Sequence, residues 1–164
     1  MCFYTSREHA GTTAVQLIAE SKDKVRAKML WNDRKGPKRM VIEDGLLYGF
    51  VGRGGDKLQV RDLMTGEKLS EVRAPLVPHH FSAIAGGYLF AMDYDGKALV
   101  ATTGKEPEIV GVSRLGMRGY KKYDYFNQGS QPFFSGNRIF MNSYTDVYCV
   151  GNPDEHTRLS EAHR

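Results

Sequence analysis

The sequence predicts an all-β fold built from repeated four-stranded antiparallel sheets. The first observation is the composition, since 18 of the 164 residues are Gly and 17 are Tyr or Phe, which is typical of short strands joined by tight turns. The second is a short pattern that occurs three times, and the third is the regular spacing of further strands after each copy. With 41% hydrophobic and 26% charged residues, the chain resembles soluble globular proteins and has room for one domain.

The repeated pattern occupies residues 41–48, 83–90 and 133–140. In each copy two apolar residues precede an Asp-Gly, Gly-Gly or Gly-Asn pair, and a run rich in aromatic and branched residues follows. These pairs tolerate the positive φ angles of a two-residue hairpin turn. The pattern therefore predicts three β-hairpins with equivalent turns.

Each hairpin is followed by a third predicted strand, and the first two also by a fourth. The third strands cover residues 57–61, 97–102 and 146–150, and the fourth strands cover residues 69–73 and 108–113. The second copy starts 42 residues after the first, and the third starts 50 residues after the second. Four-stranded units at this spacing are typical of β-propeller blades, because one such sheet cannot cover its own apolar faces and stacks on its neighbours.

The first and last units are incomplete. Residues 2–5, 14–19 and 24–31 match the second, third and fourth strands of a preceding unit, and the last unit stops after its third strand. We predict a β-propeller arc of about four partial or whole four-stranded blades over residues 1–151, in preference to a closed four-bladed ring. The blade units cover about residues 1–31, 38–73, 81–113 and 131–150, and a polar, disordered tail covers residues 152–164.

The turn after the third strand of the second unit resembles a known repeat. Residues 58–69 are similar to the repeat of the pyrroloquinoline-quinone-like (PQQ-like) β-propellers, with an apolar strand, Asp-x-x-Thr-Gly-Glu from Asp62 to Glu67, and another strand. The resemblance covers about residues 1–151 and is to the C-terminal blades of bacterial members. Members often place a Trp a few residues after Thr-Gly, where it packs between blades. This chain has none at residues 67–72, and Trp31 is its single tryptophan.

The resemblance implies a non-enzymatic binding or scaffold module that forms the C-terminal part of a larger protein. Quinoprotein dehydrogenases of the wider family hold the quinone and a calcium ion at the ring axis, often beside two adjacent cysteines. The cysteines of this chain, Cys2 and Cys149, are far apart in sequence, so we predict no cofactor. The alternative is a fragment of a quinoprotein-type oxidoreductase, which would use pyrroloquinoline quinone and calcium through residues in missing blades.

Positive charge is concentrated in the connections between predicted blades. In a propeller these connections emerge on one face, and here they cover residues 32–39, 73–80 and 114–131, with nine Lys and Arg against two Asp. The whole chain carries only +4. The candidate ligand-binding residues on this loop face are Arg34, Lys35, Arg73, His79, His80, Arg118, Tyr120, Lys121, Lys122, Tyr123 and Tyr125.

Two interpretations of the loop face remain open. Basic groups interleaved with aromatic rings are suited to a protein or to an anionic or glycan ligand, and we do not expect nucleic acid. In the other interpretation the aromatic rings only cover the propeller face while the lysines keep it soluble. His79 and His80 point to opposite sides of an extended chain, so we do not expect them to bind one metal ion together. The chain also contains no recognised catalytic motif, so no metal or catalytic site is predicted.

Expected partners also include the remaining blades of a longer chain or a second copy of this one. The start of the chain has no basic segment followed by an apolar run, and no stretch of 18 apolar residues occurs, so we expect neither a signal peptide nor a membrane span within it. A periplasmic or otherwise exported location follows from the resemblance alone.

Overall fold

The regular structure of the described residues consists of antiparallel β-sheets. The computed structural model describes residues 11–52, 54–75, 82–93, 96–114, 132–142 and 146–151, and also the backbone of residues 2–5 and of residue 81. Within these ranges the chain forms strands and turns and no helix, so none of the described segments is a helix that could cross a membrane. The predicted all-β class is confirmed.

The strands form four sheets, which we call blades I to IV. Each blade is an antiparallel meander whose strands pair in sequence order. Blade I contains β1 (Cys2–Thr5), β2 (Thr12–Ser21) and β3 (Lys24–Asp33), and blade II contains β4 (Lys38–Glu43), β5 (Leu46–Val51), β6 (Lys57–Asp62) and β7 (Lys68–Arg73). Blade III contains β8 (Phe81–Ala85), β9 (Tyr88–Met92), β10 (Lys97–Thr102) and β11 (Ile109–Arg114), and blade IV contains β12 (Phe133–Ser135), β13 (Arg138–Asn142) and β14 (Val147–Val150).

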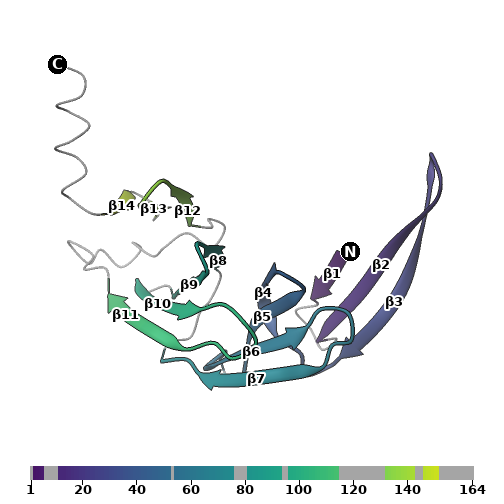
Figure 1. Ribbon diagram of the computed structural model, residues 1–164, viewed down its shortest axis with the longest axis horizontal. Helices are drawn as coiled ribbons and strands as arrows, with labels where there is room; N and C mark the ends of the chain where they lie inside the picture. The colour runs from purple at the N-terminus through teal and green to yellow at the C-terminus, as the bar shows by residue number, and fades with distance from the viewer. Residues whose placement is uncertain are drawn as a thin grey trace, which may run out of the picture.

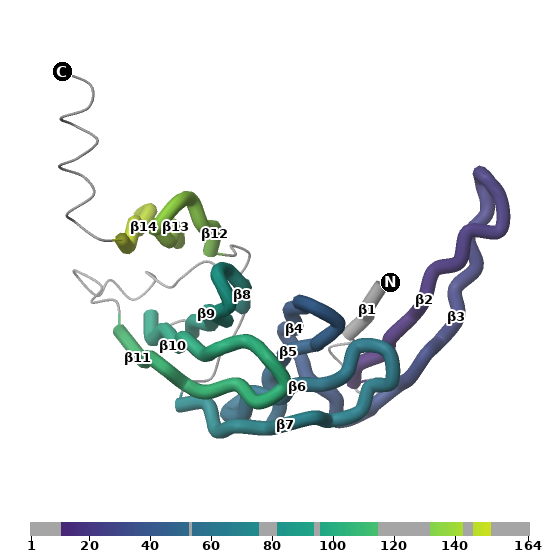
Figure 2. Tube along the Cα trace, viewed as in Figure 1, coloured from purple at the N-terminus to yellow at the C-terminus, as the bar shows by residue number. Residues whose placement is uncertain are grey.

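The blades follow one another along an open arc (Figures 1 and 2), as expected for a β-propeller arc. Blade I lies at one end of the arc and blade IV at the other. The strands β2 and β3 are 10 residues long, whereas the strands of blade II are 6 residues long. The outer part of the β2–β3 hairpin therefore extends beyond the body of the arc (Figure 1).

The three predicted hairpins are present, but their turns are not all equivalent. Asp44 and Gly45 have φ angles of 48° and 75°, and Gly86 and Gly87 have 57° and 79°. In the third turn only Gly136 is left-handed, with φ of 55°. Positive φ at both central residues is typical of a type I′ turn, and positive φ at the first alone is typical of type II′. The prediction of three equivalent turns is thus wrong in backbone type, since the third sequence has Asn where the others have Gly.

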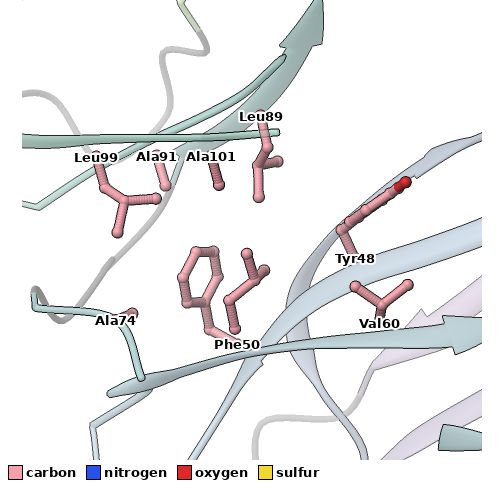
Figure 3. Packing of buried hydrophobic residues seen from close by; sticks show 9 residues of the cluster. Tyr48, Phe50, Val60, Ala74, Leu89, Ala91, Leu99 and Ala101 are labelled. Atoms are coloured by element: carbon pink, nitrogen blue, oxygen red, sulfur yellow. The ribbon is translucent and has the colours of Figure 1, made fainter. Parts of the chain in front are cut away.

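The main core lies between blades II and III (Figure 3). It is built by every second residue of the middle strands, because alternate side chains of a strand share one face. Each of these side chains is at most 2% exposed, and full burial of a large apolar side chain contributes about 1.5–3 kcal/mol. The core residues are Tyr48, Phe50, Leu58 and Val60 from blade II and Leu89, Ala91, Leu99 and Ala101 from blade III.

Blades I and II meet through a more polar contact. The indole Nε1 of Trp31 donates to the backbone oxygen of Leu63 at 3.1 Å, and its ring packs against Gly66 so closely that a Cβ there would lie 2.6 Å from Trp31 Cδ2. Beside it, the buried Arg61 donates to the Asp33 carboxylate at 2.5 Å and to the backbone oxygen of Gly66 at 2.9 Å. The single tryptophan of the chain therefore packs between blades.

Blades II and III are held by hydroxyl groups at the corresponding turn. The backbone N–H of Gly104 donates to the Tyr48 hydroxyl at 2.7 Å, and the Ser70 hydroxyl donates to the backbone oxygen of Lys105 at 2.5 Å. Burial raises the pKa of Tyr48 above its usual value. Hydrogen bonds that the Tyr48 hydroxyl accepts and the Ser70 hydroxyl donates thus link these blades, and β7 has no tryptophan.

We predict that Gly66→Ala destabilises the fold by about 1–3 kcal/mol more than Gly45→Ala. The two glycines have φ angles of 76° and 75°, so both substitutions carry the same backbone cost of about 1–2 kcal/mol. A Cβ at Gly45 meets nothing within 4 Å, whereas a Cβ at Gly66 collides with Trp31. Urea unfolding of both variants measures the difference, and equal losses would contradict the importance of the Trp31 contact.

Candidate functional site

A basic cavity lies where two connections meet at one end of blade II. The connection between β3 and β4 forms one wall, and the connection between β5 and β6 forms another. The cavity has a volume of about 450 Å³, which is in the range of small-ligand sites. We call it the basic pocket, and its lining residues are Arg34, Lys35, Gly36, Lys38, Arg39, Phe50, Val51, Gly52, Gly54 and Gly55.

The wall that carries Arg34 and Lys35 is fixed by hydrogen bonds. The backbone N–H of Lys35 donates to the Asp33 carboxylate at 2.8 Å, and the Thr12 hydroxyl donates to the backbone oxygen of Pro37. Gly36 and Pro37 are buried, whereas Arg34 and Lys35 are exposed. The turn thus presents two exposed basic side chains from a backbone that is held in place.

Arg39 enters the pocket from a distorted part of β4. Its φ angle is 54°, which is uncommon for a residue with a Cβ. The register of β4 against β5 shifts between Lys38 and Val41, and such bulges redirect side chains near functional sites. Backbone strain of this kind costs about 1–3 kcal/mol, and the surrounding contacts must stabilise it.

The described residues that line the pocket make it electropositive, since they include four basic residues and no Asp or Glu. Among the described residues, Arg34, Lys35 and Lys38 form no ion pair. The Asp33 carboxylate is bound to Arg61 and to the Lys35 backbone. Asp56 lies outside the lining beside Gly52, where a Cβ would be 2.2 Å from its Oδ1.

This arrangement is suited to binding an anion with several oxygen atoms. Guanidinium groups bind carboxylate or phosphate oxygens through two parallel hydrogen bonds, and ammonium groups add charge without fixed geometry. The described residues contain no group of three or more His, Cys, Asp and Glu side chains that could hold a metal ion. The basic side chains of the pocket can therefore attract an anion through their positive charge.

The corresponding end of blade III differs in charge. A groove there of about 360 Å³ is lined by Asp93, Lys97, Val112, Ser113 and Arg114. The Asp93 carboxylate accepts from the backbone N–H of Lys97 at 2.9 Å, and the Lys97 ammonium donates to the backbone oxygen of Pro75. The excess of positive charge in the basic pocket is thus not shared by this groove.

The structure brings together only some of the residues singled out from the sequence. Arg34 and Lys35 line the basic pocket, whereas Arg73 ends β7 and pairs with Lys57 in the sheet register. The remaining candidates lie outside the described residues: His79, His80, Arg118, Tyr120, Lys121, Lys122, Tyr123 and Tyr125.

Sequence reasoning missed the second wall of the pocket. This wall includes Phe50, Gly52, Gly54 and Gly55 from the end of β5 and the turn that follows. The available signal was three glycines within four residues after an apolar strand, which marks a close approach of backbone to a neighbour or ligand. The connection between the second and third strands of a blade also opens on the face that carries the connections between blades.

Comparison with known proteins supports the fold. No protein-family model matches the chain, and no curated protein matches its sequence. Among solved structures it is similar to BamB from Moraxella catarrhalis, a β-propeller, with 15% identity, a TM-score of 0.54 and coverage of 84% of this chain and 46% of that one. The fold of the chain is thus that of a β-propeller.

Two further structures have the same kind of similarity. One is a chain in the Saccharomyces cerevisiae complex of a Dbp5 variant bound to Nup159, a Gle1 variant, IP6 and ADP, at 12% identity and a TM-score of 0.58, with coverage of 93% and 42%. The other is the computationally designed Ika4 protein, at 10% identity and a TM-score of 0.52, with coverage of 91% and 88%. The chain therefore spans less than half the length of BamB and of the matched chain in the Dbp5 complex.

One ion pair beside the pocket makes stability depend on pH. The Lys57 ammonium lies 2.8 Å from the Glu71 carboxylate, and hydrogen bonds from Lys57 and Gln59 lower the pKa of Glu71. The same Glu71 hydrogen bond raises the pKa of Lys57. A carboxyl whose pKa is lowered in the folded state stabilises the fold above its unfolded pKa, and this contribution is lost as the pH falls through the folded pKa.

We therefore predict that Glu71→Gln lowers the dependence of stability on pH. The urea midpoint of the original chain should fall between about pH 7 and about pH 3, and that of the variant should fall less. Glu108→Gln is the matched control, because that carboxylate has no hydrogen bond or ion pair with a described residue. Identical slopes for Glu71→Gln and the original chain would disprove the role of this pair.

Proposed function

We propose that this chain is a non-enzymatic binding module on a PQQ-like β-propeller, and that its basic pocket binds an anionic ligand. The observation that carries the proposal is the described part of the pocket lining, in which Arg34, Lys35 and Lys38 have no ion pair with a described residue and no carboxylate is present. The positive charge of these three side chains is available to an anionic ligand. The cavity is a feature of rigid strand ends and their connections, as binding sites on β-folds often are.

The turn from Asp62 to Glu67 supports the PQQ-like assignment. One Asp62 carboxylate oxygen accepts from the Met64 N–H at 2.9 Å, from the Thr65 N–H at 2.8 Å and from the Thr65 hydroxyl at 2.9 Å. These hydrogen bonds lower the pKa of Asp62 below its usual value, and the two donated by Thr65 have the largest effect. They explain why a repeat with this turn needs Asp and Thr three residues apart.

The motif has Gly after Thr because this turn of blade II packs closely on blade I. Gly66 lies against the ring of Trp31 from blade I, which matches the packing of a tryptophan between blades that the resemblance implies. The tryptophan here belongs to β3 and the Thr-Gly pair to the turn before β7. The contact thus supports a repeat of the PQQ-like type.

The chemistry of the pocket favours ligands with several oxygen atoms and more than one negative charge. Four cations around about 450 Å³ match a sulfated or phosphorylated glycan, or an acidic segment of a protein. In each case Arg34 would bind two oxygens through its guanidinium group, while Lys35 and Lys38 would neutralise the remaining charge. The module would then hold its partner without changing it chemically.

Inorganic tripolyphosphate is a suitable probe, with affinity measured by isothermal titration calorimetry. We predict that Lys35→Gln combined with Lys38→Gln weakens binding about tenfold, equivalent to two charge contacts of about 0.7 kcal/mol each. Raising the salt concentration from about 0.05 M to about 0.2 M should weaken the original interaction.

The matched control is Lys22→Gln combined with Lys28→Gln, which removes the same charge from the exposed β2–β3 hairpin. This variant should bind tripolyphosphate almost as tightly as the original chain. Equal losses in the two double variants would show that only net charge matters. That result, or no binding by the original chain, would refute a specific anion site at the basic pocket.

A further inference from the structure

The outer part of the β2–β3 hairpin has one apolar face. We call residues 15–29 the arm. The cross-strand pairs on this face are Val15 with Met29, Leu17 with Ala27, and Ala19 with Val25. Leu17, Val25 and Met29 are 48%, 60% and 66% exposed.

The opposite face of the arm is mostly charged. Gln16 pairs with Lys28 in the sheet register, and the Glu20 carboxylate lies 2.9 Å from the Lys24 ammonium and 2.8 Å from Arg26 Nε. A two-stranded ribbon with one apolar face is only marginally stable in water without a covering surface. The arm therefore has a face that needs a partner and a face that suits solvent.

The apolar face of the arm points away from the rest of the arc. At the base of the hairpin, Ala14 is paired with Trp31, and Trp31 packs on blade II. Val15 follows Ala14 on β2, so it lies on the other face of the sheet. Figures 1 and 2 show the arm at the free end of blade I, with no described strand beside its outer part.

Blade IV ends the arc with a second exposed apolar face. The rings of Phe133 and Phe140 are stacked, with centroids 4.8 Å apart, and Phe140 is paired with Cys149 in the register. Phe134, on the other face, contacts Phe90 of blade III at 5.0 Å. The outward face therefore carries Phe133, Phe140, Cys149 and Val147, with Arg138 and Asn142 on the same face at its two ends. Phe133 and Val147 are 59% and 73% exposed.

The remainder of the molecule indicates what covers such faces. Each end face is the outward side of a sheet whose inward side already packs on the neighbouring blade. Blades II and III bury their facing side chains sheet against sheet. The two ends lie at opposite ends of the open arc (Figure 1), so one copy cannot bring its own ends together. A second copy supplies both complementary faces at once.

We infer that two copies of this chain associate head to tail, with the arm of each copy packed on the outward face of blade IV of the other. Both apolar ends of both copies are then covered around a twofold axis, and no end remains for further growth. This association is independent of the anion site proposed above. A foreign protein would need two different matching patches to achieve the same coverage.

The test begins with size-exclusion chromatography and light scattering of the 164-residue chain. We expect a mass twice the 18.4 kDa of one chain. Met29→Lys and Val147→Lys should each give monomers, and an equimolar mixture of the two should recover dimers, because one interface in the mixed pair is unaltered. Val112→Lys, at an exposed valine on β11, is the control and should remain dimeric.

Other outcomes would overturn the inference. A monomer at all concentrations, or an open ladder of oligomers, would mean that other blades or another protein cover the ends. An arm-to-arm dimer would tolerate Val147→Lys, and mixing would not rescue Met29→Lys.

Cross-linking keeps the test decisive if the lysine variants do not fold. Cys149 is free and exposed, so Leu17→Cys in a Cys2→Ser background should form covalent dimers with a short bismaleimide, and adding Cys149→Ser should abolish them. Val110→Cys, at an exposed valine on β11, should not cross-link. Equal cross-linking of the two introduced cysteines would also exclude the head-to-tail pair.

Discussion

The burial of each blade's apolar face on its neighbour is the constraint on which the rest of this structure depends. A four-stranded antiparallel sheet has two faces, and a thin meander cannot cover either one by itself. In the described residues this requirement is met most completely between blades II and III, where Phe50 and Leu58 face Leu89 and Leu99. The positions of the turns, the connections and the basic pocket follow from the stacking that this burial imposes.

The two interfaces of blade II use different chemistry, and this difference gives the stack an order. The face toward blade III is apolar and non-directional, whereas the face toward blade I places the buried Arg61 between Asp33 and the backbone of Gly66. A buried guanidinium that loses its carboxylate costs several kcal/mol, so a mispaired neighbour is penalised strongly. Directional contacts of this kind specify which blade lies beside which, while the apolar contacts supply most of the stabilisation.

The repeat and its strands could be predicted from the sequence because hairpin turns and strand alternation are local properties. The backbone type of the third turn is a local property as well, since Gly136 precedes Asn137 and Gly at the first central position alone is typical of type II′. The partner of Trp31 could not be predicted, because the ring contacts Gly66, 35 residues along the chain and in another blade. The pocket combines two connections and a bulge at Arg39, and no single segment encodes that combination.

Asp33 connects the stacking of blades to the geometry of the basic pocket. One of its carboxylate oxygens accepts from Arg61 of blade II, and the other accepts from the backbone N–H of Lys35 in the pocket wall. The conformation of the basic turn is therefore fixed by the same side chain that joins blades I and II. A change that separates these blades would release the turn as well, so the proposed anion site and the integrity of the arc depend on one shared carboxylate.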